Sequence, residues 1–172
     1  SAGAGADIIS AGDGNDSITG GDGVDNIDGG DGDNAYIYNG AQFVSAETVT
    51  GGVGTDTVIL TANGQIVLDG QFENKSDLEA ITFANGSNVL TLGTFANGAF
   101  GTTPTVAVTT GTGADSIDAS DAAFTTAGID VNTSGGNDTI IGSSQDDTIT
   151  GGAGADSLTG GNGLDVFNYS LG

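Results

Sequence analysis

The sequence predicts an all-β solenoid, a fold in which short parallel strands stack in successive coils. Three observations predict it. A nine-residue period runs through two blocks, residues 2–59 and 110–168. Each clear repeat has a large apolar residue at its eighth place, and glycines occupy most of the second and fourth places. A fixed short period is typical of repeat architectures, in which each unit buries its apolar residue against its neighbours.

The first block begins with four repeats in register. They read AGAGADIIS, AGDGNDSIT, GGDGVDNID and GGDGDNAYI over residues 2–37. A weak copy follows at residues 42–50 and a clear one at 51–59. The three residues around the eighth place are enough for a strand of about 10 Å. Side chains alternate along a strand, so we expect the apolar residue to point inward and its polar neighbours outward.

The middle of the chain, residues 60–109, lacks the period. Apolar clusters at residues 66–68, 81–83 and 89–92 predict strands, and the Asn-Gly pairs at 63–64, 85–86 and 97–98 predict turns. This stretch is either a set of wider coils of the same solenoid or an inserted β element. The sequence therefore divides into a repeat block over 1–59, irregular β structure over 60–109 and a second block over 110–172.

The second block restores the period. TGTGADSID at residues 110–118 is a clear repeat, and residues 124–132 form a doubtful one. Four more repeats follow over residues 133–168. A flexible acidic linker is the alternative interpretation of such Gly- and Asp-rich sequence. A linker would not keep an apolar residue at every ninth position, so a folded structure is favoured.

The charge of the chain restricts its partners. The 172 residues include 23 acidic residues and a single basic one, Lys75, which gives a net charge of −22. This charge argues against binding to nucleic acid or to an anionic membrane, and it favours cations. The absence of Cys and His excludes disulfides, zinc–thiolate sites and histidine-based catalysis. No apolar run approaches the ~20 residues that span a bilayer, so we expect no membrane insertion.

The repeat pattern G-G-x-G-x-D-x-U-x, where U is a large apolar residue, resembles the RTX, or haemolysin-type, calcium-binding repeat. The resemblance covers both repeat blocks. It implies a right-handed parallel β-roll in which two repeats form one coil and several Ca²⁺ ions stack in the turns. It also implies a non-catalytic module without catalytic or organic-cofactor residues.

The candidate calcium ligands lie at the sixth place of the repeats. Alternate repeats share an edge of the stack, so sixth-place carboxylates about 4.8 Å apart would repel one another without a cation. These residues are Asp7, Asp16, Asp25, Asn34, Asp56, Asp115, Asp138, Asp147, Asp156 and Asp165. Further turn residues are expected to complete the coordination: Gly12, Asp13, Asn15, Gly21, Asp22, Val24, Gly30, Asp31, Asp33, Gly152, Ala153, Ala155, Gly161, Asn162 and Leu164.

The predicted function is that of a structural calcium-binding module. The resemblance implies type I secretion and folding on Ca²⁺ outside the cell. We favour a surface-layer-like or adhesin protein, with other copies of the chain as a candidate partner in a lattice. The alternative is a folding and secretion module attached to an enzyme such as a protease, lipase or epimerase. Because the chain begins and ends within repetitive sequence, we expect it to be a piece of a larger protein.

Overall fold

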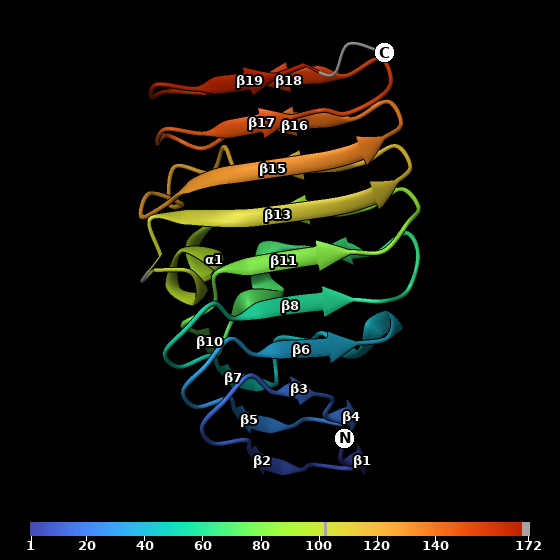
Figure 1. Ribbon diagram of the computed structural model, residues 1–172, viewed down its shortest axis with the longest axis vertical. Helices are drawn as coiled ribbons and strands as arrows, with labels where there is room; N and C mark the ends of the chain where they lie inside the picture. The colour runs from blue at the N-terminus through green and yellow to red at the C-terminus, as the bar shows by residue number, and fades with distance from the viewer. Residues whose placement is uncertain (102, 170–172) are drawn as a thin grey trace.

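The computed structural model describes residues 1–101 and 103–169. The fold is mostly β, and the described strands pair in parallel within their sheets. They stack along one long axis, with the first and the last described strands at opposite ends of the stack (Figure 1). The predicted parallel arrangement of short strands is therefore confirmed.

One wall of the molecule is an eight-stranded sheet whose strands follow one another in sequence order. Its strands are β3 (Ser17–Ile18), β6 (Ala35–Tyr38), β8 (Thr57–Leu60), β11 (Ala80–Phe83), β13 (Thr105–Thr112), β15 (Gly128–Gly135), β17 (Thr148–Thr150) and β19 (Val166–Asn168).

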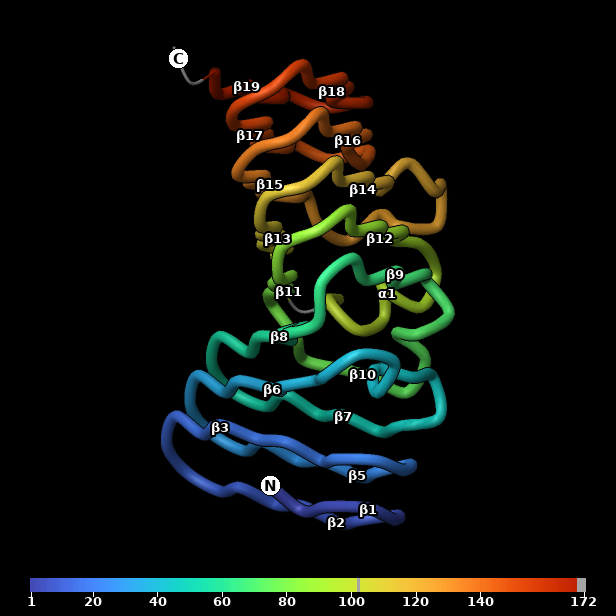
Figure 2. The backbone as a smooth tube through the Cα atoms, turned by 90° about the vertical axis from the view of Figure 1, so that its right-hand side faces the viewer, coloured from blue at the N-terminus to red at the C-terminus, as the bar shows by residue number. Residues whose placement is uncertain are grey.

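The opposite wall consists of two smaller sheets, as the side view shows (Figure 2). The four-stranded sheet contains β2 (Ile8–Ser10), β5 (Asn26–Asp28), β7 (Thr48–Thr50) and β10 (Lys75–Ser76). The five-stranded sheet contains β9 (Ile66–Val67), β12 (Val89–Thr91), β14 (Ser116–Asp118), β16 (Thr139–Ile141) and β18 (Ser157–Thr159). A short pair, β1 (Gly3–Ala4) and β4 (Gly21–Asp22), joins two turns.

The coils differ in length along the stack. At both ends, equivalent residues of successive coils are 18 residues apart, which is two nine-residue repeats. The separation grows to 22 between Asn34 and Asp56 and to 27 between Asn88 and Asp115. The wider coils hold the 3₁₀ helices η1 (Gly40–Gln42) and η2 (Asp69–Phe72) and the helix α1 (Thr94–Ala99). None of the helices within the described residues is long and apolar enough to cross a membrane.

The core lies between the two walls. The eighth-place residues Ile27, Val58, Ile117, Ile140 and Ile149 are fully buried, as their position in the repeat predicts. In the wide coils the space between the walls is filled by a row of aromatic rings. Ring centroids are 5.1 Å apart from Tyr38 to Phe43, 5.5 Å from Phe43 to Phe72 and 5.3 Å from Phe72 to Phe100. Such edge-on and tilted contacts are favourable for aromatic pairs.

Candidate metal sites in the turns

The turns between the walls depend on glycine. Gly30 and Gly32 have φ of 85° and 125°, which L-residues with side chains rarely adopt. A Cβ built on Gly30 would collide with the carbonyl oxygen of Gly12, and one on Gly32 with that of Gly14. Backbone oxygens of one coil therefore lie directly against the glycines of the next. This close approach lines the space between turns with carbonyl groups.

The sixth-place side chains connect successive coils. Along the eight-stranded wall, the Asp16 N–H donates to Asn34 Oδ1 at 3.0 Å and the Asn34 N–H to Asp56 Oδ1 at 3.0 Å. The Asp56 N–H then donates to Glu79 Oε2 at 2.7 Å. Near the C-terminal end of the same wall, the Asp147 N–H donates to Asp165 Oδ1 at 3.1 Å. Each side chain thus accepts a hydrogen bond from the equivalent backbone N–H of the preceding coil.

The opposite wall repeats this arrangement. The Asp7 N–H donates to Asp25 Oδ1 at 3.0 Å. In the five-stranded sheet, the Asp115 N–H donates to Asp138 Oδ1 at 2.8 Å, and the Asp138 N–H to Asp156 Oδ1 at 3.0 Å. The structure therefore brings the sixth-place residues together in the columns that the repeat register predicts. Their role as metal ligands remains a proposal.

Two members of these columns were missed by the sequence analysis. Asn88 accepts from the Gln65 N–H at 2.9 Å, and Glu79 continues the column of Asp56. The signal for Asn88 was present, because Gly86, Asn88 and Leu90 keep the fourth, sixth and eighth places of a repeat. The absence of the first two glycines hid it.

The second carboxylate oxygen is the feature that points to a cation. Within residues 1–101 and 103–169, Oδ2 of Asp16, Asp25, Asp56 and Asp138 is buried without a hydrogen-bond partner. A Cβ on Gly20 would collide with Asp25 Oδ2, and one on Gly51 would lie 2.9 Å from Asp56 Oδ2. The Oδ2 atoms of Asp25 and Asp56 thus face glycines of their own turns. Burial raises the pKa of Asp56, as expected for a carboxylate removed from water.

A related cluster surrounds Glu47, the sixth residue of the weak repeat. Glu47 is fully buried, and neither carboxylate oxygen has a hydrogen-bond partner among the described residues. Burial raises the pKa of Glu47 to about 7, against the opposing effect of the Lys75 charge. Glu47 follows Asp25 in the column of the four-stranded sheet, because Asn26 and Ile27 pair with Thr48 and Val49.

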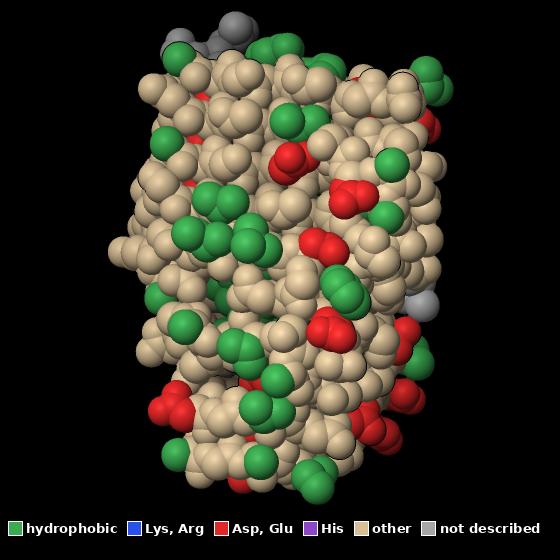
Figure 3. Space-filling view, turned by 180° about the vertical axis from the view of Figure 1, so that it is seen from behind, with side chains coloured by type: hydrophobic (Ala, Val, Ile, Leu, Met, Phe, Trp, Pro, Cys, Tyr) green, Lys and Arg blue, Asp and Glu red, His purple; other side chains and the backbone are tan. Residues whose placement is uncertain are grey.

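Lys75 supplies a positive charge inside the protein at this point. It pairs with Val49 and so occupies a core position of β10. Its ammonium donates to the carbonyl oxygens of Val44 at 2.8 Å, Glu47 at 3.1 Å and Glu73 at 3.2 Å, and lies 5.1 Å from the centre of the Phe43 ring. Burial lowers the pKa of Lys75 to about 8. Consistent with this burial, the face in Figure 3 shows acidic side chains and no basic one.

The remaining predicted ligands lie on the outside of the turns. Asp13, Asp22 and Asp31 are exposed, and Asp22 Oδ1 accepts from Gln42 Nε2 at 2.8 Å. Val24 and Leu164 are exposed as well. The side chains of these residues do not join the buried carboxylates, so their contribution to a site would come from backbone oxygens.

The fifth place forms a second ladder that the sequence analysis did not predict. Asn15 Oδ1 accepts from the Asp33 N–H at 2.9 Å, and Asp33 Oδ1 accepts from the Thr55 N–H at 2.8 Å. Asn137 and Asp146 do the same for Ala155 and Leu164. These bonds run in the opposite sense to those of the sixth place. The four junctions that carry both ladders are therefore each held by two side-chain bonds of opposite direction.

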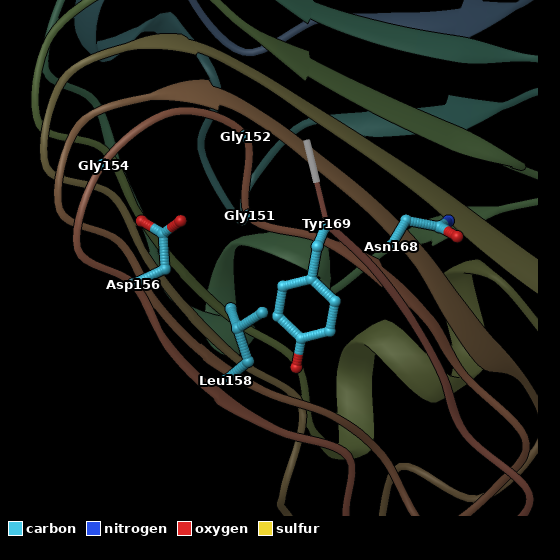
Figure 4. Close-up of a pocket in the computed structure, with 7 residues that line it drawn as sticks. All are labelled: Gly151, Gly152, Gly154, Asp156, Leu158, Asn168 and Tyr169. Atoms are coloured by element: carbon cyan, nitrogen blue, oxygen red, sulfur yellow. The ribbon is translucent and has the colours of Figure 1, made fainter. Parts of the chain in front are cut away.

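The last turn of the five-stranded wall shows how such a site is arranged (Figure 4). A cavity of about 390 Å³ is lined by Gly151, Gly152, Gly154, Asp156, Leu158, Asn168 and Tyr169. The Asp156 carboxylate points toward the glycine turn, whereas the Asn168 side chain points away from it (Figure 4). In this turn, too, one carboxylate faces a glycine backbone. Gly161, which lies in the following turn, approaches the Ser143 carbonyl oxygen.

The donor set fits a hard cation. No group of three or more acidic, His or Cys side chains comes together in the part of the chain that the structure describes. A site here would combine one or two carboxylates with backbone carbonyl oxygens. Ca²⁺ accepts six to eight oxygen ligands of these kinds in flexible geometry, whereas Mg²⁺ requires a near-ideal octahedron.

A comparison with protein families matches residues 1–35 and 132–167 to the RTX calcium-binding nonapeptide repeat (4 copies). The chain carries RTX repeats. RTX nonapeptide repeats bind calcium, and they form structural, non-catalytic modules of secreted proteins. Neither the curated proteins nor the solved structures gave a match.

Proposed function

We propose that this chain is a calcium-binding structural module that folds outside the cell when Ca²⁺ binds in its turns. One observation carries the proposal: buried carboxylate oxygens without a protein partner face glycine turns lined by carbonyl groups. An uncompensated buried carboxylate is strongly unfavourable. A bound cation would remove this penalty, so the free energy of ion binding becomes free energy of folding.

The proposed architecture is a right-handed parallel β-roll with ions between successive turns. The sixth-place carboxylates would supply the side-chain ligands, and the glycine-rich turns would supply backbone oxygens. At ~1 mM Ca²⁺ and a Kd near 10⁻⁴ M, a site stabilises the folded state by about 1.4 kcal/mol. The division into repeat blocks at 1–59 and 110–172 around residues 60–109 belongs to this proposal.

Within this class we favour a surface-layer-like or adhesin protein secreted by a type I system. The support is compositional: a repeat-poor β region in the middle, abundant Thr, Ala and Gly, and no Cys, Met or His. Calcium would then stiffen the molecule and bridge copies in a lattice. The alternative is a folding module beside a secreted enzyme, and a catalytic domain in the adjoining sequence would favour it.

A calcium titration followed by circular dichroism tests the central proposal. We expect little β structure in EGTA and a cooperative gain with millimolar Ca²⁺, with Mg²⁺ much less effective at equal concentration. A full β spectrum in excess EGTA that Ca²⁺ leaves unchanged would contradict calcium-dependent folding. Equal potency of Mg²⁺ would indicate charge screening instead of coordination.

Sedimentation in 10 mM Ca²⁺ distinguishes a surface-layer-like or adhesin protein from a folding module attached to an enzyme. A lattice protein should self-associate at high concentration and dissociate again in EGTA. A strict monomer under these conditions would favour the enzyme-linked module and leave the calcium proposal intact.

A further inference from the structure

Among the Asp and Asn residues at the sixth place, two groups stand out that their position in the repeat does not distinguish. In the first group, the open group, the second carboxylate oxygen is buried and has no partner within the described chain: Asp16, Asp25, Asp56 and Asp138. Asp25, Asp56 and Asp138 are 2%, 0% and 1% exposed. In the second group, the closed group, donors of the protein itself occupy that position.

Asp115 belongs to the closed group. Its Oδ2 accepts a hydrogen bond from the Thr110 hydroxyl at 2.6 Å. Its Oδ1 accepts from the backbone N–H of Asn88 at 2.7 Å and from Asn88 Nδ2 at 2.9 Å. Thr110 is itself buried, at 1% exposure. A calcium ion at Oδ2 would have to displace this hydroxyl and leave it without a partner, which is unfavourable in a buried site.

Asp147 is closed by a single serine. The Ser143 N–H donates to Asp147 Oδ2 at 2.7 Å, and the Ser143 hydroxyl donates to Oδ1 at 2.9 Å. Oδ1 also accepts the Ile129 N–H at 2.7 Å. Both carboxylate oxygens are therefore bound by protein donors.

Asn34 and Asn88 close their turns through the amide group. Asn88 Nδ2 donates to the carbonyl oxygens of Ala84 at 3.0 Å and Gly86 at 2.9 Å. Asn34 Nδ2 donates to the Gly32 carbonyl oxygen at 3.0 Å. The amide N–H groups of these side chains therefore form hydrogen bonds with carbonyl oxygens of the turn that could otherwise coordinate an ion.

We propose that the chain itself determines which turns bind calcium: the open turns take an ion, and the closed turns of Asn34, Asn88, Asp115 and Asp147 take none. The inference rests on the proposed calcium-binding function. It revises the sequence-based expectation that Asn34, Asp115 and Asp147 are ligands. Calcium is then confined to part of the stack, and hydroxyl or amide donors replace it elsewhere.

The same substitution at two neighbouring positions of one column tests this inference. Asp138→Asn alters an open turn and Asp115→Asn a closed one, and the chain already tolerates asparagine at this place in Asn34 and Asn88. Bound Ca²⁺ is counted by equilibrium dialysis, and circular dichroism checks the fold. We expect Asp138→Asn to lose about one ion per chain and to raise the calcium midpoint by about twofold. Asp115→Asn should keep the wild-type ion count.

The variant Thr110→Val tests whether a closed turn of the same column can be made to bind Ca²⁺. It keeps the shape of the side chain but removes the hydroxyl donor, so Asp115 Oδ2 becomes an open oxygen. We expect about one additional Ca²⁺ per chain, whereas Thr110→Ser, which retains the hydroxyl, should leave the count unchanged. An ion lost in Asp115→Asn, or an unchanged count in Thr110→Val, would overturn the inference. A wild-type chain that bound no Ca²⁺ would overturn the proposed function as well.

Discussion

The end coils and the middle coils contribute strands to the same two walls, but they differ in length and in the side chains at the sixth place. In the end coils, 18 residues make one coil, and aspartate fills every sixth place except that of Asn34. In the middle of the eight-stranded wall, Val106 and Ile129 stand at the places equivalent to Asp147. Both are fully buried. The column of acidic side chains is therefore interrupted by apolar ones where the coils are wide.

The end coils and the middle coils are therefore stabilised by different interactions. A narrow coil buries few apolar side chains and encloses a carboxylate, so its stability depends on a cation. A wide coil has room for Phe43, Phe72 and Phe100 between the walls. Burial of large rings stabilises the fold by roughly 25 cal/mol per Å² without any ion. The comparison predicts that the two regions respond differently to calcium and to mutation.

Removal of calcium should have the largest effect and should be uneven. In EGTA, we expect amide protection to fall by about 100-fold or more in residues 1–35 and 132–167, because neighbouring sites there lose their ions together. Strands β11 and β13 should retain more protection. Hydrogen exchange with mass spectrometry measures both regions in one sample. A uniform loss along the chain would show that the middle depends on ions as much as the ends do.

Sequence reasoning succeeded where the structure is local and periodic. The strands, their inward residues and the columns through Asp16 and Asp138 all follow from the nine-residue period. It failed where contacts join distant residues of irregular sequence. Helix α1 is an example: Asp69 Oδ1 accepts the N–H groups of Gly93 and Ala96 at 2.8 Å, across 24 and 27 residues. No local pattern in residues 94–99 predicts a helix, because the carboxylate that stabilises this helix lies far away in the sequence.

The candidate sites show the same limit. The sixth place could be read from the repeat, but the donor that closes a turn is not part of the pattern. Thr110 lies five residues before Asp115, and Ser143 four before Asp147. Which carboxylate is open depends on these side chains and on burial, which only the folded chain defines.

Lys75→Met tests the charge inside the wide coils. Methionine preserves much of the apolar stem but leaves Glu47 without a nearby cation and three carbonyl oxygens without their donor. Loss of a charged donor that leaves buried carbonyl oxygens without a partner typically costs about 1.5–3 kcal/mol. We expect a destabilisation of this size by chemical denaturation in saturating Ca²⁺. The double variant with Glu47→Gln should recover part of it, and no recovery would contradict a stabilising electrostatic interaction between Lys75 and Glu47.

Gly30→Ala tests the close approach of turns in the narrow coils. The new Cβ would meet the Gly12 carbonyl oxygen, and φ of 85° is strained for alanine. We expect a loss of about 1–3 kcal/mol and a higher calcium midpoint. Gly70→Ala in η2 is the control, because a Cβ there meets nothing within 4 Å. Its effect should stay within about 0.5 kcal/mol, and equal effects of the two variants would argue against glycine-dependent turns.

The smallest expected effect is the pH dependence of the calcium-free chain. Burial raises the pKa of Glu47 from 4.5 to about 7, so between these values the folded state holds a proton that the unfolded state has lost. Stability then decreases as the pH rises through this window and is greater near pH 5.5 than near pH 8. Asp56, Glu79 and Asp147 have raised pKa values as well and act in the same direction.

A matched variant separates Glu47 from the general relief of repulsion that protonation gives a chain of charge −22. Circular dichroism in calcium-free buffer should show more β structure at pH 5.5 than at pH 8. Glu47→Gln removes the titrating group while keeping its size, so the pH dependence should weaken by up to about 1 kcal/mol per pH unit in this window. Glu73→Gln, at an exposed position of the same column, should leave it unchanged. If both variants responded to pH like the wild type, the gain of β structure at low pH would come from the reduced net charge of the chain. Protonation of the buried Glu47 carboxylate would then contribute nothing to the stability of the calcium-free middle coils.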